Sequence, residues 1–180
     1  MPNQTDQDEF AIRRAAAADA EKLAAFGAET FTETFGHFYR PEDLAAFLAA
    51  SQSPAYYRDV LNAEAWRTYL AVTRAGDLAG YVMCGPMSLP YDSARSDAVE
   101  LKRLYVSRTR QGAGLGSRLI AWALDWAHER RAGEIYLGVF NANTGAQSLY
   151  ARHGFVKVGE YYFAVGRQRD HEFIMRRSLG

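Results

Sequence analysis

The segment RQGAGLGS at residues 110–117 lies between a strand-like stretch and an amphipathic helical stretch. Upstream, residues 99–106 are β-branched, aromatic and roughly alternating, as is typical of a strand. Downstream, apolar residues recur at the helical period from Leu115 to Trp126. Glycines at such a junction let the backbone approach a ligand closely, and the free N–H groups of the first helical turn favour an anion. The segment therefore predicts a strand, a pyrophosphate-binding loop and a helix in succession.

Several phosphate-binding motifs are rich in glycine, and two of them do not fit this segment. A Walker A loop requires a lysine directly after its last glycine, but the residues after Gly114 are Leu115, Gly116 and Ser117. A dinucleotide-binding G-x-G-x-x-G motif that begins at Gly112 requires glycine at position 117, where Ser117 stands. The pattern Q/R-x-x-G-x-G/A does fit, through Gln111, Gly114 and Gly116. This pattern resembles the coenzyme A loop of the GNAT superfamily of N-acetyltransferases.

A second motif follows at the appropriate separation. Residues 135–140 read as a buried strand, and after them come Asn143, Tyr150 and the pair Gly154 and Phe155. This order of strand, asparagine, tyrosine-bearing helix and Gly-Phe resembles the second GNAT signature. Two ordered motifs identify the chain as a member of this superfamily far more specifically than one glycine-rich loop does.

The resemblance covers essentially residues 10–178. Residues 31–35, FTETF, and the tail at 165–175 are similar to the bacterial spermidine/spermine N-acetyltransferase-like branch. The resemblance implies acetyl-CoA as cosubstrate. It also implies that the acetyl group is transferred to a primary amine on a small molecule such as a polyamine, by direct attack in a ternary complex. A protein N-terminal or lysine acetyltransferase stays open, as does a non-catalytic acetyl-CoA-binding module.

Composition fits one domain and suggests few other partners. The 180 residues are 48% hydrophobic, which is enough for one sizeable core. Twenty-one basic and twenty-one acidic residues cancel, so we expect neither nucleic acid nor a membrane as a partner. The polar start of the chain and the absence of a ~20-residue apolar run predict a cytoplasmic location. A homodimer stays open.

Cysteine and histidine usage gives two further expectations. Cys84 is the single cysteine, lies in a strand-like stretch and is expected to be a small buried apolar residue rather than a nucleophile. The four histidines have no spacing suited to a metal, so no metal is predicted.

The expected fold is a single-domain α/β fold of the GNAT type. A mixed twisted sheet of about seven strands is flanked by about four helices in the order β-αα-βββ-α-β-α-ββ. Residues 1–8 are expected to form a disordered tail, and residues 9–180 the acetyltransferase domain. In chain order, strands are expected at 10–13, 66–73, 78–87, 99–106, 135–140, 155–165 and 171–177, and helices at 19–35, 41–47, after 114 and around 150.

The resemblance implies a set of cosubstrate contacts. Backbone groups of Leu104, Tyr105 and Val106 are expected to hold the pantetheine arm as an added strand would be held. The Val106 N–H is also expected to polarise the thioester carbonyl. Pyrophosphate is expected to bind mainly the main-chain amides of Gln111, Gly112, Ala113, Gly114, Leu115, Gly116 and Ser117.

Two residues of the second motif have implied roles. Tyr150, seven residues after Asn143, matches the general acid that donates its phenol proton to the departing CoA sulfur. The alternative is a core tyrosine. Asn143 is expected to cap the tyrosine helix, to contact the pantetheine amide, or to do both.

Glu100 is the predicted general base. It lies eleven residues before Gln111, a spacing that resembles the base of some protein-acetylating relatives. On a regularly pleated strand it shares a face with Lys102, Leu104 and Val106. The alternatives are an ordinary ion pair of Glu100 with Lys102 or a neighbouring arginine, and a base formed by a chain of waters.

The acceptor site is predicted from the branch. Its groove is expected between residues 31–39 and 161–170, with Phe31, Glu33 and Phe35 as substrate-binding residues. Glu29 and Glu33 are four residues apart on one helical face and are suited to attract a polyamine cation. The alternative is a solvated face opposite the phenylalanines.

Overall fold

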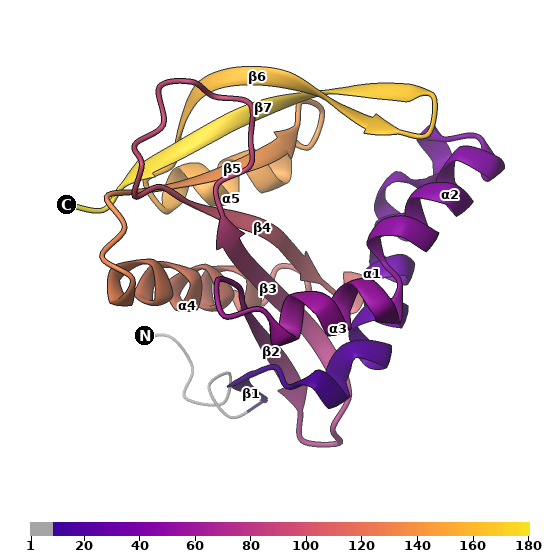
Figure 1. Ribbon diagram of the computed structural model, residues 1–180. Helices are drawn as coiled ribbons and strands as arrows, with labels where there is room; N and C mark the ends of the chain where they lie inside the picture. Colours follow the sequence, from indigo (N-terminus) through magenta and orange to yellow (C-terminus); the bar gives the residue numbers. More distant parts are fainter. Residues whose placement is uncertain (1–8) are drawn as a thin grey trace.

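The computed structural model describes residues 9–180, so the predicted disordered tail at 1–8 lies outside the described residues. One seven-stranded sheet has the strand order β1-β2-β3-β4-β5-β7-β6, and the predicted α/β fold is confirmed (Figure 1). The strands are β1 (Phe10–Arg14), β2 (Arg67–Thr73), β3 (Leu78–Pro86), β4 (Val99–Val106), β5 (Glu134–Phe140), β6 (Val156–Val165) and β7 (Gln168–Ser178). The helices are α1 (Ala20–Phe35), α2 (Pro41–Ser51), α3 (Pro54–Asn62), α4 (Leu115–Glu129) and α5 (Thr144–Arg152).

Two apolar cores stabilise the sheet from opposite faces. Helix α4 packs on one face through residues such as Leu119 and Trp126, and Tyr150 of α5 and Phe155, just before β6, extend this core. On the other face, α1 and α3 form a second core with β2 and β3, around Leu23 and neighbouring tyrosines. Figure 1 shows α1 and α3 on the side of the sheet away from α4, with α2 beyond them beside the β6–β7 turn.

The prediction of two helices before β2 was incomplete, because a third helix, α3, is also present. Pro54 occupies its first turn, where a missing N–H costs nothing, and the Ser53 side chain accepts a hydrogen bond from the Tyr56 N–H at 3.2 Å. Helix α2 also continues to Ser51, beyond the predicted end at residue 47. Tyr57 and Val60 of α3 are buried, so packing against the sheet stabilises this short helix.

A β-bulge in β4 changes which side chains share a face. Met83 of β3 pairs with Arg103, whereas the next residue, Cys84, pairs with Leu101, so Lys102 is the extra residue of β4. Before the bulge, odd-numbered side chains such as Leu101 point toward the α4 core, whereas beyond it the even-numbered ones do. The bulge therefore sets the orientation of every later β4 side chain.

The predicted common face of Glu100, Lys102, Leu104 and Val106 was wrong for this reason. Leu104 and Val106 pack against the α4 core, the same core that holds Leu101. Glu100 instead bonds Ser88 and Lys102 on the other side of the strand. An alternation rule cannot detect the inserted residue, because the sequence of β4 is continuously strand-like.

Strands β4 and β5 separate soon after they start. They run parallel, and their register comprises only Val99 with Ile135 and Glu100 with Tyr136. On its other edge, β5 pairs with β7 along its whole length, from Glu134 to Phe140. Among residues 9–180, the edge of β4 that faces β5 therefore has no strand partner from residue 101 to residue 106, and its backbone groups are available to a ligand.

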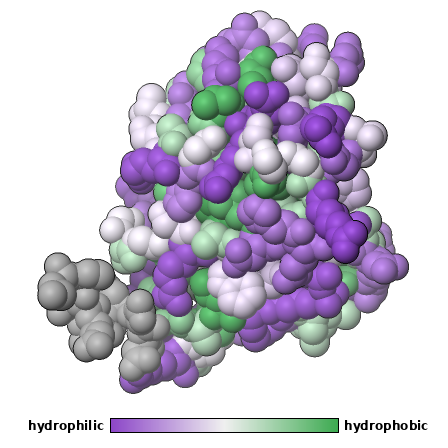
Figure 2. All heavy atoms as spheres, turned by 90° about the vertical axis from the view of Figure 1, so that its left-hand side faces the viewer, coloured by the Kyte–Doolittle hydropathy of each residue, from purple (hydrophilic) through white to green (hydrophobic). Residues whose placement is uncertain are grey.

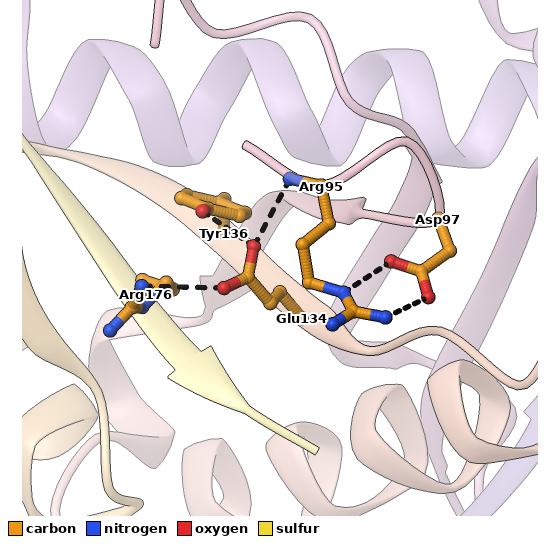
Figure 3. Close-up of polar contacts among 5 residues, drawn as sticks. All are labelled: Arg95, Asp97, Glu134, Tyr136 and Arg176. Carbon is orange, nitrogen blue, oxygen red and sulfur yellow. Dashed lines mark hydrogen bonds and ion pairs between the residues drawn. The ribbon is translucent and has the colours of Figure 1, made fainter. Parts of the chain in front are cut away.

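A cluster around Glu134 fastens the β3–β4 loop, residues 87–98, to β5 and β7 (Figure 3). Glu134 accepts hydrogen bonds from the Tyr136 hydroxyl at 2.7 Å, from the Arg95 backbone N–H at 3.3 Å and from Arg176 at 3.3 Å. The Arg95 side chain in turn forms a two-pronged contact with Asp97, with both distances 2.9 Å. Since this loop also carries Ser88, the cluster helps to position a residue that contacts Glu100.

We expect Glu134→Ala to lower the free energy of unfolding by about 1–3 kcal/mol, because it leaves a buried hydroxyl and a backbone N–H without an acceptor. Urea denaturation followed by circular dichroism measures the change. Asp97→Ala is the matched control: it removes an exposed partner of Arg95 and should change stability little. Equal stability of the Glu134→Ala and Asp97→Ala proteins would contradict a structural role for this cluster.

The outer surface differs from the interior in polarity. Figure 2 shows the left-hand face of Figure 1, where hydrophilic residues predominate and hydrophobic ones show through in smaller areas between them. None of the helices within residues 9–180 combines the length and apolar character that crossing a membrane requires.

Candidate active site

One cavity of about 1230 Å³ runs along the opening between β4 and β5. At one end it is lined by the loop after β4 and the start of α4, including Gln111 and Ser117. In the middle it is lined by the unpaired part of β4 and by Tyr150 of α5. At the other end it reaches α1, β6 and β7, including Glu172. The two sequence motifs and the predicted acceptor groove therefore belong to one continuous site.

The glycine-rich loop adopts a conformation that requires glycine. Gly112 and Gly114 have φ angles of 83° and 77°, in the left-handed region that residues with a Cβ rarely adopt. Gly114 is the N-cap of α4, so the N–H groups of the following first turn have no partner within the helix. A Cβ on Gly116 would lie 3.1 Å from Leu149 of α5, so this glycine permits close packing instead.

Most of the predicted phosphate loop faces the cavity. Gln111, Gly112, Gly114, Gly116 and Ser117 line it, as do the cationic side chains of three arginines, Arg108, Arg110 and Arg152. Ala113 does not line it, and the Leu115 side chain is buried in the α4 core, so only its backbone remains for an anion. This combination of helix N-terminus, left-handed glycines and nearby arginines is suited to a phosphate group.

The remaining predicted cosubstrate contacts lie along the same wall. Leu104, Tyr105 and Val106 line the cavity, and the Gln111 side chain donates a hydrogen bond to the Val106 carbonyl at 3.2 Å. Asn143 Oδ1 accepts a hydrogen bond from the Ala146 N–H at 3.1 Å, which confirms its predicted role as the α5 N-cap. A contact of Asn143 with pantetheine stays a prediction.

Tyr150 projects from α5 into the middle of the cavity. The residue is 7% exposed, and its ring packs edge-on against Phe155 with the ring centres 5.9 Å apart. Burial raises the pKa of its phenol well above the usual value, and Tyr105 and Glu172 raise it further. The phenol is therefore protonated throughout the neutral pH range and can act as a proton donor.

Glu100 is deeply buried, at 3% exposure, and has three donors. Its Oε2 accepts hydrogen bonds from the backbone N–H and the hydroxyl of Ser88, both at 2.8 Å. Its Oε1 lies 3.0 Å from Lys102 Nζ. The ion pair that the sequence offered as an alternative to the base role is therefore present, and the base role itself stays a prediction.

Aromatic side chains form the acceptor end of the cavity. Phe31 is buried, Phe35 is half-buried and Glu33 is exposed; all three line the cavity, whereas Glu29 does not. Their role in binding an acceptor stays a prediction. The Phe31 ring packs against Phe35 and Phe47, with centroid distances of 5.2 and 4.6 Å. Further aromatic contacts join Phe35 to Phe140 and Phe47 to Phe163.

Helix α2 and the β6–β7 turn close this end of the site. Asp43 of α2 accepts a hydrogen bond from the Arg167 N–H at 3.1 Å, and Figure 1 shows the turn beside α2. Asp170 of β7 accepts hydrogen bonds from the Tyr39 hydroxyl and, at 2.9 Å, from Gln168. The predicted groove between residues 31–39 and 161–170 is thus formed by segments that contact each other.

Sequence reasoning did not single out Glu172 of β7, although it lines the same cavity. Its Oε2 accepts a hydrogen bond from the Tyr161 hydroxyl at 2.5 Å. Burial is the main cause that raises the pKa of this carboxyl. The signal in the sequence was the alternation of β7, where Glu172 and Ile174 point to one side and His171 and Phe173 to the other.

Two other sequence expectations can be examined in the structure. Cys84 is buried in the α4 core, and burial raises the pKa of its thiol, which confirms a packing residue rather than a nucleophile. Within residues 9–180, no three histidine, cysteine, aspartate or glutamate side chains gather closely enough to hold a metal ion. The expectation that the reaction uses no metal stays a prediction.

Comparison with known proteins shows the family. Residues 19–155 match the model of the acetyltransferase (GNAT) family, so the chain belongs to this family of N-acetyltransferases. An N-acetyltransferase of Mycobacterium tuberculosis with no stated acceptor is 32% identical over 167 residues, which cover 89% of this chain and 98% of that protein. These matches agree with the resemblance carried by the two sequence motifs.

Two further comparisons concern the branch and the fold. The spermine/spermidine N(1)-acetyltransferase of Bacillus subtilis is 33% identical over 89 residues, which cover 49% of this chain and 59% of that protein. The crystal structure of the PaiA N-acetyltransferase from Thermoplasma acidophilum in complex with coenzyme A superposes with a TM-score of 0.76. It is 18% identical and covers 94% of this chain and 98% of that chain, so it supports the fold.

Proposed function

We propose that this protein transfers the acetyl group of acetyl-CoA to a primary amine of a small molecule, with a polyamine as the acceptor class. The observation that carries the proposal is the continuity of the cavity. A helix N-terminus suited to a phosphate lies at one end, and an aromatic, acidic chamber lies at the other. The two reactants can therefore meet at the opening between β4 and β5 without a covalent enzyme intermediate.

The β4 wall and the phosphate loop supply the cosubstrate contacts in this account. The unpaired edge of β4 at Leu104, Tyr105 and Val106 pairs with the pantetheine amides, and the Val106 N–H polarises the thioester carbonyl. The backbone of the Gln111–Ser117 segment binds the pyrophosphate, with Arg108 and Arg110 nearby.

The chemistry requires one proton donor and one proton acceptor. The uncharged amine attacks the thioester carbon, the C–S bond breaks, and Tyr150 protonates the departing thiolate. Glu100 and Glu172 are both carboxylates of the cavity that are candidates to accept the amine proton. Acceptor recognition is assigned to the aromatic end, where Phe31 and Phe35 contact the aliphatic chain and Glu33 attracts a cation.

An amine panel with release of the CoA thiol as the readout tests the proposal. Spermidine, a monoamine of similar length and a peptide with a free N-terminus are compared at one acetyl-CoA concentration. We expect thiol release with spermidine and weaker release with the monoamine. If only the peptide supports release, the protein-acetylating alternative replaces the small-molecule function. If acetyl-CoA binds but no amine or peptide supports release, a non-catalytic binding module replaces it.

We expect Glu33→Gln to raise KM for spermidine more than KM for a monoamine, since only spermidine carries a second cation to this carboxylate. Because Glu33 is exposed, the change should be modest and should decrease at high salt. Steady-state kinetics at two salt concentrations measures it. Glu29→Gln is the control, because Glu29 lies on the same helix but outside the cavity. Equal changes in KM for both amines would rule out Glu33 as a site for the distal cation.

A further inference from the structure

Glu172 occupies a space that β5 leaves open. It pairs with Phe140 of β5 on one side and with Tyr161 of β6 on the other. A Cβ on Gly138 would lie 2.5 Å from the Tyr161 hydroxyl and 2.9 Å from Glu172 Oε2. Glycine at this β5 position therefore makes room for the two side chains to meet. Because the pair also lines the cavity, the vacated space serves the site rather than a packed core.

The carboxylates of this cavity differ in their partners. Glu100 has three donors, one of which is the Lys102 ammonium. Glu172 has a single neutral donor, the Tyr161 hydroxyl, and no cation of residues 9–180 lies within ion-pair distance of it. One of its oxygens thus remains free for a ligand. A half-buried carboxylate has a negative charge that is costly without a neighbouring cation, and a bound ammonium would supply the opposite charge.

The charged and titratable groups around Glu172 also favour a cationic ligand. Burial is the largest cause that raises the pKa of its carboxyl, and the nearby negative charges of Asp170 and Glu100 raise it further. The Tyr161 hydrogen bond and the charge of Lys102 act in the opposite direction. The titratable groups around Glu172 come from every neighbouring element. They are Asp170 of β7, Tyr161 of β6, Glu100, Lys102 and Tyr105 of β4, Tyr150 of α5, and Tyr39 before α2.

Neighbouring aromatic rings complete a chamber for an alkyl ammonium. Phe140, which pairs with Glu172 across the strands, contacts Phe35, and Phe163 of β6 contacts Phe47. Such rings bind aliphatic chains by apolar contact and ammonium groups through their faces. A protonated primary amine on an aliphatic chain therefore matches both the carboxylate and the walls around it.

We propose that Glu172 accepts the proton of the acceptor ammonium, with Tyr161 as the residue that positions its carboxylate. The N–H bond of the ammonium breaks, its electron pair stays on nitrogen, and the proton forms an O–H bond with Glu172. The amine then forms the C–N bond as the C–S bond breaks, and the thiolate takes the phenol proton of Tyr150. Loss of the second nitrogen proton restores Tyr150 through solvent, and Glu172 releases its own proton to water.

This assignment rests on the proposed function and divides the work between two carboxylates. Glu172 acts on the reacting nitrogen, whereas Glu100 holds Ser88 and Lys102 in place. As a base, Glu172 is active only when ionised, so kcat/KM should rise with pH through its raised pKa. This rise lies at lower pH and is followed by a fall near the amine pKa of ~10, which belongs to the substrate, because the acceptor enters as the ammonium.

The pH dependence of kcat/KM for spermidine and for a monoamine, measured by thiol release, tests the proposal. Glu172→Gln should lower kcat for both amines by about 10²–10⁴-fold. It should also remove the rise of kcat/KM at lower pH, called the lower rise below. Glu160→Gln is the matched control, since Glu160 lies one residue before Tyr161 and contacts Lys157 and His171 outside the cavity. Tyr161→Phe should move the lower rise to higher pH because it removes the hydrogen bond that stabilises the carboxylate. Tyr162→Phe, at an exposed neighbour, should leave the rise where it is.

A second substitution guards against misfolding of Glu172→Gln. Gly138→Ala places a methyl group against the tips of Tyr161 and Glu172, which can move without a shift of the backbone, and it should lower kcat while circular dichroism stays native.

Three results would overturn the assignment. The first is a wild-type pH profile and kcat in Glu172→Gln, or in Gly138→Ala where Glu172→Gln does not fold. The second is loss of the lower rise in Glu100→Gln instead. The third is a rise in KM for spermidine alone, which would make Glu172 a site for the distal cation. Wild-type protein that acetylates no amine would defeat the proposed function together with this assignment, whereas an active wild type with any of the three results defeats this assignment alone.

Discussion

Tyr150→Phe is expected to lower kcat by about 10²–10⁴-fold, the range typical of a lost general acid, while acetyl-CoA affinity stays nearly unchanged. The substitution keeps the ring against Phe155 and removes only the hydroxyl. Because burial keeps the phenol protonated well above neutral pH, the wild-type rate should show no decline from Tyr150 ionisation below pH ~10.

Steady-state kinetics with calorimetric titration of acetyl-CoA separates the two effects. Tyr69→Phe is the control, since Tyr69 is a buried tyrosine of the same core that does not line the cavity. Equal turnover by Tyr150→Phe and wild-type protein would reduce Tyr150 to a packing residue, the alternative that the sequence also allowed.

Gly114→Val is expected to raise the dissociation constant for acetyl-CoA by at least about tenfold, which corresponds to ~1.4 kcal/mol. Valine disfavours the left-handed φ of 77° at this position, so the loop must change its conformation, and the side chain blocks close approach of pyrophosphate. Calorimetric titration of the folded variant measures the loss.

Gly76→Val separates strain from binding. Gly76 has a φ of 87° in the β2–β3 turn, and a Cβ there meets no atom within 4 Å, as is also true at Gly114. Both variants should lose similar stability, but only Gly114→Val should lose affinity. Undiminished affinity of Gly114→Val would remove the phosphate-loop assignment.

Local patterns predicted much of the fold. The glycine-rich loop, the helix after it and the tyrosine helix all carry signals that are strong over a few residues, and the structure confirms the elements. The turn at Gly76 lies between the strands predicted at 66–73 and 78–87. Helix α3 was not predicted, although Ser53 and Pro54 mark its start, because it is only nine residues long and depends on burial of Tyr57 and Val60.

The parts of the site that the sequence did not predict depend on contacts between distant residues. The bulge at Lys102 follows from how β4 pairs with β3, and no feature of the β4 sequence marks it. The pair formed by Tyr161 and Glu172 depends on a glycine more than twenty residues earlier in the chain, Gly138. Such space between strands becomes visible only when the strands are placed side by side.

The most direct test of the central claim, direct transfer from acetyl-CoA to an amine within one cavity, is a mass measurement on a single-turnover mixture. Protein is mixed with a substoichiometric amount of acetyl-CoA, with and without spermidine, and both protein and amine are analysed. The account predicts monoacetylated spermidine equal to the thiol released, with no acetyl group on the protein in either mixture. An acetylated protein that forms without spermidine, or thiol release without acetylated amine, would contradict it.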